Sequence, residues 1–200
     1  MVYKISLSST QGTGKTTLAT LVSGELKKRD VEACALAEMS TLAQEKGLPI
    51  NEQTTREAQL WILHTQFATE LAHQARTAPP KYEVVVCDRG VDNYCYLKRR
   101  FGEDEYALQM TLGHLRHFPY DQIYVLPIVN DTLGRGEGVR STDRIFQQEM
   151  DTAIRAFFDN QRIPYRALPQ PAAEDRFREE WVKIIVNQTL TDLEKGGLTR

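Results

Sequence analysis

The sequence is short of cysteines, of long apolar runs and of excess charge of either sign. Its three cysteines, Cys34, Cys87 and Cys95, show no CxxC spacing, which argues against a disulfide scaffold or a zinc site. No apolar stretch is long enough to cross a bilayer, and no export signal opens the chain. A net charge of -2 argues against a broad basic face that binds extended nucleic acid. The 5′ end of a polynucleotide is still a candidate substrate. We therefore expect a cytoplasmic protein with buried, reduced thiols.

Short apolar runs alternate with helical patterns along the chain, which predicts an α/β fold with a parallel sheet. We expect a single domain over residues 1–200, because 41% hydrophobic content suffices for one core at this length. The expected strands are 3–8, 32–37, 83–87, 122–126 and 164–168. The expected helices are 15–29, 54 or 55 to 78, 91–100, 105–117, one after a glycine-rich loop at 130–138, and 174 to about 193.

The most specific motif is the loop that joins the first expected strand to the first expected helix. This order of strand, glycine-rich loop and helix is the context of a phosphate-binding P-loop. The positions expected to contact a nucleoside triphosphate are Gln11, Gly12, Thr13, Gly14, Lys15, Thr16 and Thr17. In such a loop Lys15 would reach the β- and γ-phosphates, and Thr16 would ligate Mg²⁺. Ser9 stands where the GxxxxGK[ST] pattern has its first glycine, and the alternative is a turn that binds nothing.

Two acidic residues follow expected strands and so should lie at the same sheet edge as the P-loop. Asp88 and Arg89 end the apolar run at 83–87, and Glu38 follows the run at 32–37. A carboxylate there can ligate Mg²⁺ or accept a proton from an attacking hydroxyl, and Arg89 can position an acceptor oxygen. The alternatives are helix caps for both acids and a surface ion pair for Arg89.

Two further groups are candidates for ligand contacts. Gln66, within the helix expected to end at 78, could read the edge of a base, although a solvated glutamine is the plainer alternative. Arg135, Arg140 and Arg144 lie in and just after the glycine-rich loop. Arginines on a closing loop can neutralise charge on a transferring phosphoryl group, and the alternative is an exposed turn.

On these residues the chain resembles the P-loop kinase group of thymidylate kinases, deoxynucleoside kinases and the nicotinamide-riboside kinase domain of bacterial NAD regulators, and most of all the last. The matching stretches, in the family's order, are SSTQGTGKTTLA, AEMS, CDRGVDNYCYLKRRFG, YDQIYVLP and EGVRSTDRIFQQEMDTAI before IPYRALP. The resemblance implies a three-layer P-loop NTPase fold with a five-stranded parallel sheet and an arginine-bearing lid at about 130–161.

The resemblance also implies roles for the candidate residues. Lys15 and Thr16 would hold the phosphates of ATP and Mg²⁺, and Asp88 with Arg89 would serve the acceptor hydroxyl and the transferred phosphate. Arg140 and Arg144 would belong to the lid. Glu38 matches the general base of deoxynucleoside kinases, but Met39-Ser40 depart from that family's pattern, so Asp88 and Glu38 both stay candidates for the base.

The predicted function is ATP- and Mg²⁺-dependent phosphorylation of a nucleoside-like hydroxyl, with nicotinamide riboside or a deoxynucleoside as acceptor. Gln66, Glu38 and Arg89 would contact the acceptor, and the chain could form a homodimer. A nucleoside monophosphate kinase or a polynucleotide 5′-hydroxyl kinase would use extra positive charge, which Arg56 and the run Lys98-Arg99-Arg100 could supply. A regulatory ATPase or GTPase without an acceptor is the alternative of another class.

Overall fold

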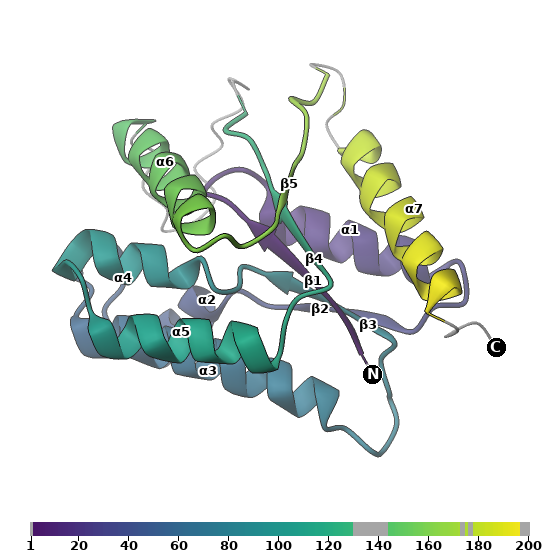
Figure 1. The fold of residues 1–200 in the computed structure, drawn as a ribbon, viewed down its shortest axis with the longest axis horizontal. Coiled ribbons are helices and arrows are strands. Elements are labelled where there is room, and N and C mark those ends of the chain that lie inside the picture. Colours follow the sequence, from purple (N-terminus) through teal and green to yellow (C-terminus); the bar gives the residue numbers. More distant parts are fainter. Residues whose placement is uncertain (1, 130–143, 173–174, 176–177, 197–200) are drawn as a thin grey trace.

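A computed structural model describes residues 2–129, 144–172, 175 and 178–196. Its core is a five-stranded, entirely parallel sheet in the order β2-β3-β1-β4-β5 (Figure 1). The strands are β1 (Tyr3–Ser8), β2 (Ala33–Leu36), β3 (Val84–Asp88), β4 (Gln122–Val125) and β5 (Arg166–Ala167). The predicted α/β fold with five parallel strands is confirmed, and the strand before the P-loop, β1, lies at the centre of the sheet.

The central strand β1 shows why these residues form a sheet buried on both faces. All six of its residues are buried, and it pairs with β3 on one side and β4 on the other, with Ile5 opposite both Val86 and Gln122. A strand covered on both faces needs no alternation of apolar and polar residues. Burial on both faces therefore explains why the strands appear in the sequence as mostly apolar runs.

Helices cover both faces of the sheet and give three layers (Figure 1). One face packs against α1 and α7 through Ile5, Leu18 and Trp181. The other packs against α3, α4, α5 and α6 through Val85, Phe67 and further apolar residues. The helices are α1 (Lys15–Lys27), α2 (Met39–Glu45), α3 (Arg56–Gln74), α4 (Asn93–Phe101), α5 (Glu105–His117), α6 (Arg144–Asn160) and α7 (Glu179–Lys195), with a 3-10 turn, η1 (Asn51–Gln53), before α3.

Some element bounds differ from the predicted ones. The sequence analysis missed α2, which spans only seven residues and packs Met39 and Ala43 against Ile62 of α3. Such a helix is too short to show a clear apolar period. The last helix begins at Glu179, later than the predicted 174, which lies outside the described residues.

Of the predicted lid at about 130–161, the structure describes residues from 144 onwards, and most of these form α6. Arg135 and Arg140 lie outside the described residues, whereas Arg144 opens α6 and is exposed. None of the helices within the described ranges is both long and apolar enough to span a bilayer.

Candidate active site

The P-loop connects the end of β1 to the start of α1 at the carboxyl edge of the sheet. Gly12 and Gly14 have φ angles of 75° and 89°, a left-handed conformation that glycine adopts without strain. Ser9 is not among the described residues with positive φ, so it costs no strain where the pattern has glycine. Its buried hydroxyl instead contacts Thr13 Oγ1 within the loop. The departure from the P-loop pattern therefore braces the loop.

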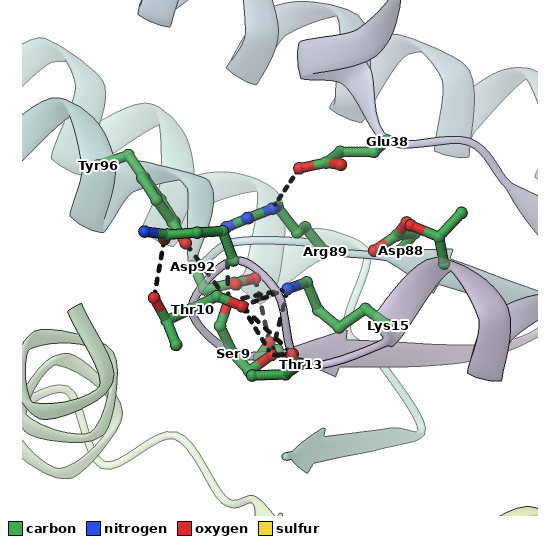
Figure 2. A network of polar contacts seen from close by, with 12 residues as sticks. Ser9, Thr10, Thr13, Lys15, Glu38, Asp88, Arg89, Asp92 and Tyr96 are labelled. Atoms are coloured by element: carbon green, nitrogen blue, oxygen red, sulfur yellow. Dashed lines mark hydrogen bonds and ion pairs between the residues drawn. The ribbon is translucent and has the colours of Figure 1, made fainter. Parts of the chain in front are cut away.

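Lys15 lies inside this loop, as Figure 2 shows. Its Nζ donates hydrogen bonds to the carbonyl oxygens of Ser9 at 3.2 Å and Thr10 at 2.6 Å. Burial, together with the nearby charge of Arg89, lowers the pKa of Lys15 to about 7. An ammonium group so buried gains most from an anion placed beside it, because the anion restores the stability of its charged form. The loop is therefore suited to hold phosphate.

Thr16 and Asp88 come together from α1 and β3. The Thr16 hydroxyl donates to Asp88 Oδ2, and the other carboxylate oxygen, Oδ1, is buried without a hydrogen-bond partner among the described residues. Burial raises the pKa of Asp88. A hydroxyl beside a carboxylate with an unsatisfied oxygen is a donor set that a hard divalent cation prefers. These two residues therefore fit the predicted Mg²⁺ site.

Glu38 and Arg89 form a buried ion pair beside the P-loop (Figure 2). Arg89 Nε donates to Glu38 Oε1 at 2.9 Å, and Nη1 donates to the Ser9 carbonyl at 3.4 Å. The guanidinium also lies over the Tyr96 ring, 4.3 Å from its centroid. Arg89 thus joins Glu38 to the backbone of the phosphate-binding loop.

Asp88 does not act as the helix cap considered from sequence. Glu38 does occupy the N-cap position of α2, as its alternative had it, but its side chain makes no capping hydrogen bond. The turn after β3 is capped by Asp92, whose Oδ1 accepts from Gly90 N at 2.8 Å and from Ser8 Oγ at 3.0 Å. Asp88 is left facing Thr16. Among the described residues, Arg89 pairs with the buried Glu38 and not with a surface acid.

Gln66 of α3 is fully buried beneath this turn. Its Nε2 donates to Glu70 Oε1 at 2.8 Å and to the Arg89 carbonyl at 3.2 Å, and its Oε1 has no hydrogen-bond partner among the described residues. The solvated alternative is therefore wrong. Its contact with an acceptor stays a prediction, and its observed contacts are with the backbone that carries Arg89.

The start of α6 contacts the P-loop through a residue that sequence analysis missed. Gln147 Nε2 donates to the Gln11 carbonyl at 3.1 Å, and a side chain at Gly12 would meet this amide, with Cβ 3.0 Å away. Gln147 lies one helical turn after Arg144, and this i, i+3 spacing could have indicated that both lie on one face of the helix.

Thr17, the last of the predicted P-loop contacts, is exposed on the first turn of α1.

Two more contributors on the segment after β3 were also missed. Asp92 holds the turn, and Tyr96, whose hydroxyl donates to the Ser9 carbonyl at 3.4 Å, supports the Arg89 guanidinium. Both follow the Asp88-Arg89 pair, and their i, i+4 spacing could have placed them on one face.

The basic residues considered for an acceptor phosphate all have partners. Arg56 pairs with Asp104 at 2.5 Å and Arg99 with Glu149 at 2.6 Å. The other two contacts are Lys98 with Glu103 and Arg100 with the Glu52 carbonyl.

Comparisons with known proteins agree with this architecture. A family model described as an AAA domain matches residues 4–176. No curated protein matches the chain significantly. Among solved structures, NadR protein in complex with NR is similar, with a TM-score of 0.72 and 12% identity over 92% of this chain and 50% of that chain. NadR protein in complex with NAD and AMP-PNP gives a TM-score of 0.67 and 10% identity over 92% and 48%.

Deoxyadenosine kinase from M. mycoides, with dCMP and dCDP bound, gives a TM-score of 0.61 and 15% identity over 94% of this chain and 99% of that chain. At such identities the likeness shows the fold alone. The chain spans about half the length of the NadR chains and nearly the whole deoxyadenosine kinase.

Proposed function

The chain belongs to the AAA domain family whose model covers residues 4–176, and from this premise we propose that it is a P-loop kinase that phosphorylates a nucleoside-like hydroxyl with ATP. The buried Glu38–Arg89 pair beside the P-loop carries the proposal. A nucleotide switch without an acceptor has no evident need for a desolvated carboxylate and guanidinium at this place. The fold shared with NadR in complex with NR and with deoxyadenosine kinase supports it.

The donor half of the site comprises residues 9–17 and Asp88. The loop amides and Lys15 would hold the phosphates of ATP, while Thr16 and Asp88 would hold Mg²⁺. The ion would neutralise charge on the phosphates. Support comes from the left-handed Gly12 and Gly14 and from the unsatisfied Asp88 Oδ1. We propose that residues 1–200 form a single kinase domain that contains this donor half.

The acceptor half comprises Glu38, Arg89 and Tyr96. We propose that Glu38 orients the acceptor hydroxyl and takes its proton, because Asp88 is engaged with Thr16. Arg89, which already bridges Glu38 and the P-loop, would hold the acceptor oxygen close to the transferred phosphoryl group. Arg144, and Arg140 and Arg135 outside the described residues, would complete the charge neutralisation from the lid.

The paired state of the surface cations favours a nucleoside over a nucleoside monophosphate. A monophosphate acceptor needs positive charge that is available to its phosphate. Arg56, Lys98 and Arg99 each pair with an acid, so binding such a phosphate would first break existing ion pairs. A polynucleotide 5′-hydroxyl kinase would catalyse the same transfer to a hydroxyl. The acceptor assay below distinguishes it from a nucleoside kinase.

A radiolabelled ATP assay with four acceptors tests the proposal. Nicotinamide riboside, deoxyadenosine, dCMP and an oligonucleotide with a free 5′-hydroxyl are each incubated with the protein, Mg²⁺ and ATP. We expect label on a nucleoside, and we expect Lys15→Ala to remove the activity while Lys27→Ala, at the end of α1, retains it. Label on dCMP or the oligonucleotide selects the corresponding alternative. ATP hydrolysis that no acceptor stimulates would favour the regulatory ATPase.

A further inference from the structure

Arg89 has a backbone conformation that its surroundings must enforce. Its φ of 77° lies in the left-handed region, which costs a residue with a side chain free energy. Both of its peptide groups are tied: Arg89 N donates to the Leu7 carbonyl at 3.1 Å, and the Arg89 carbonyl accepts from Gln66 Nε2 at 3.2 Å. The next amide, Gly90 N, is held by Asp92. The direction of the Arg89 side chain thus depends on these anchors.

A buried polar network centred on Glu70 lies directly behind the Gln66 anchor. Glu70 Oε1 accepts from Gln66 Nε2 at 2.8 Å and from the Tyr120 hydroxyl at 2.7 Å. Glu70 Oε2 contacts Lys4 Nζ at 2.8 Å and His114 Nε2 at 3.1 Å. Burial alone would raise the pKa of Glu70, but the His114 hydrogen bond and the Lys4 charge outweigh it. The group is therefore a carboxylate that accepts from four side chains.

The Glu70 network also packs against the turn itself. A Cβ at Gly90 would lie 2.5 Å from the Tyr120 hydroxyl oxygen and 2.7 Å from Ser6 Oγ. No side chain fits there, and the Tyr120 hydroxyl fills the space beside the peptide. The network therefore holds the Arg89-Gly90 peptide through both a hydrogen bond and direct contact.

Stability alone does not account well for this arrangement. Lys4 and Glu70 are each 1% exposed, and a buried ion pair often stabilises a fold no better than apolar residues of the same size. Strained backbone held by a buried polar network is instead a feature of functional sites.

We propose that Glu70 is a positioning residue for the transfer reaction, acting through Gln66 and Tyr120 to hold the Arg89 guanidinium between Glu38 and Tyr96. The role in transfer rests on the proposed function. The positioning of Arg89 can be measured without an acceptor.

Two matched tyrosine substitutions test the inference. Tyr120→Phe removes a 2.7 Å hydrogen bond to Glu70, and Tyr3→Phe removes a 2.7 Å hydrogen bond to Asp192 on α7. The two tyrosines are buried to a similar extent, so each substitution removes a hydroxyl from a similarly buried ring. Of the two, only Tyr120 contacts the turn at Gly90. The readout is the ¹⁵N-¹H resonance of Arg89 Nε, identified by its loss in Arg89→Lys. We expect Tyr120→Phe and Glu70→Gln to shift it and speed its hydrogen exchange, and Tyr3→Phe to leave it unchanged.

Kinetics with nicotinamide riboside and deoxyadenosine then separate positioning from general destabilisation. Tyr120→Phe should lower kcat about tenfold, as expected for a disturbed hydrogen bond to a charged group, with the KM for ATP unchanged. Tyr3→Phe should leave kcat as it is. An Arg89 resonance that stays in place in both Tyr120→Phe and Glu70→Gln overturns the inference, whatever the activity. If neither compound is phosphorylated while the resonance moves, the function proposal fails for these acceptors and the positioning of Arg89 stands.

Discussion

The donor half of the site is contiguous in sequence, whereas the acceptor half is assembled from separate elements. Residues 9–17 form one loop and the first turn of α1. Glu38 precedes α2, Arg89 follows β3 and Tyr96 lies on α4. A phosphate is bound largely by backbone amides, so its site needs a particular local conformation. An acceptor is held by side chains, which the fold must bring together.

The two halves also place their charge differently. The donor half has one buried ammonium, Lys15, which contacts carbonyl oxygens, while the buried carboxylate of Asp88 contacts Thr16. The acceptor half has an ion pair already formed between Glu38 and Arg89. An incoming anion therefore supplies Lys15 with its counter-charge, but a neutral nucleoside can enter the acceptor half without changing its charge. This difference gives four ways to test the division.

The largest effect is expected from the acceptor half. Glu38→Gln should lower transfer about 10²- to 10⁴-fold, which is the range for loss of a general base. Because Arg89 loses its buried partner, the melting temperature should also fall. Binding of AMP-PNP, measured by calorimetry, should change less than transfer does, because the loop amides and Lys15 would hold its phosphates.

Glu45→Gln is the control, because Glu45 is an exposed acid at the far end of α2. It should leave both transfer and melting temperature unchanged. Equal losses of AMP-PNP affinity and transfer in Glu38→Gln would mean that the two halves are one unit. Full activity in Glu38→Gln would move the role of base to Asp88.

A smaller effect is expected at the proposed Mg²⁺ ligands in the donor half. Thr16→Ala removes the hydroxyl beside Asp88 and should raise the Mg²⁺ concentration for half-maximal transfer about tenfold. Thr20→Ala is a matched control, because it is exposed one turn further along α1 and its hydroxyl bonds only the Thr16 carbonyl among the described contacts. The measurement is a Mg²⁺ titration at saturating ATP. The same titration curve for both variants would remove Thr16 from the ion site.

The same division explains how far sequence could predict the molecule. The sheet and the P-loop follow from local patterns, because apolar runs, glycines and a lysine at fixed spacing dictate strand, loop and helix. Glu38 and Asp88 could be named as candidates because the carboxyl ends of parallel strands meet at one edge of the sheet. The partners of Glu70 could not be found, because Lys4, His114 and Tyr120 come from three distant segments that only tertiary packing unites. The helix α2 was missed because it is short, and its packing on α3 stabilises it.

A proton-linkage measurement sharpens the contrast in charge. The pKa of Lys15 is lowered to about 7 by burial and by Arg89, from 10.5. Between pH 7 and pH 10.5 the Lys15 side chain is protonated in the unfolded chain but not in the folded chain. The contribution of Lys15 to the free energy of unfolding therefore rises with pH over this range, and it is lost as the pH falls through 7. Bound ATP favours the charged form. We therefore expect up to about one proton to be taken up on AMP-PNP binding at pH 8 to 9.

Calorimetry in two buffers of different ionisation enthalpy gives the number of protons. Lys15→Met should abolish the uptake, whereas Lys27→Met, on the exposed end of α1, should retain it. Adding a nucleoside should cause no comparable uptake, because Glu38 and Arg89 already neutralise each other. Uptake on nucleoside binding, or none on AMP-PNP binding, would contradict the assignment of charge to the two halves.

The smallest effect is expected where α6 meets the donor half. Gln147→Ala removes one neutral hydrogen bond to the Gln11 carbonyl, worth about 1 kcal/mol, so the KM for ATP should rise about fivefold with the acceptor KM unchanged. Gln148→Ala, on the next and exposed position of the same helix, removes the same side chain without that contact and should have no effect. If the acceptor KM rises instead, α6 serves the acceptor half. Because Gln147 reaches the loop at a peptide next to Gly12, a change confined to ATP would make α6 part of the donor half.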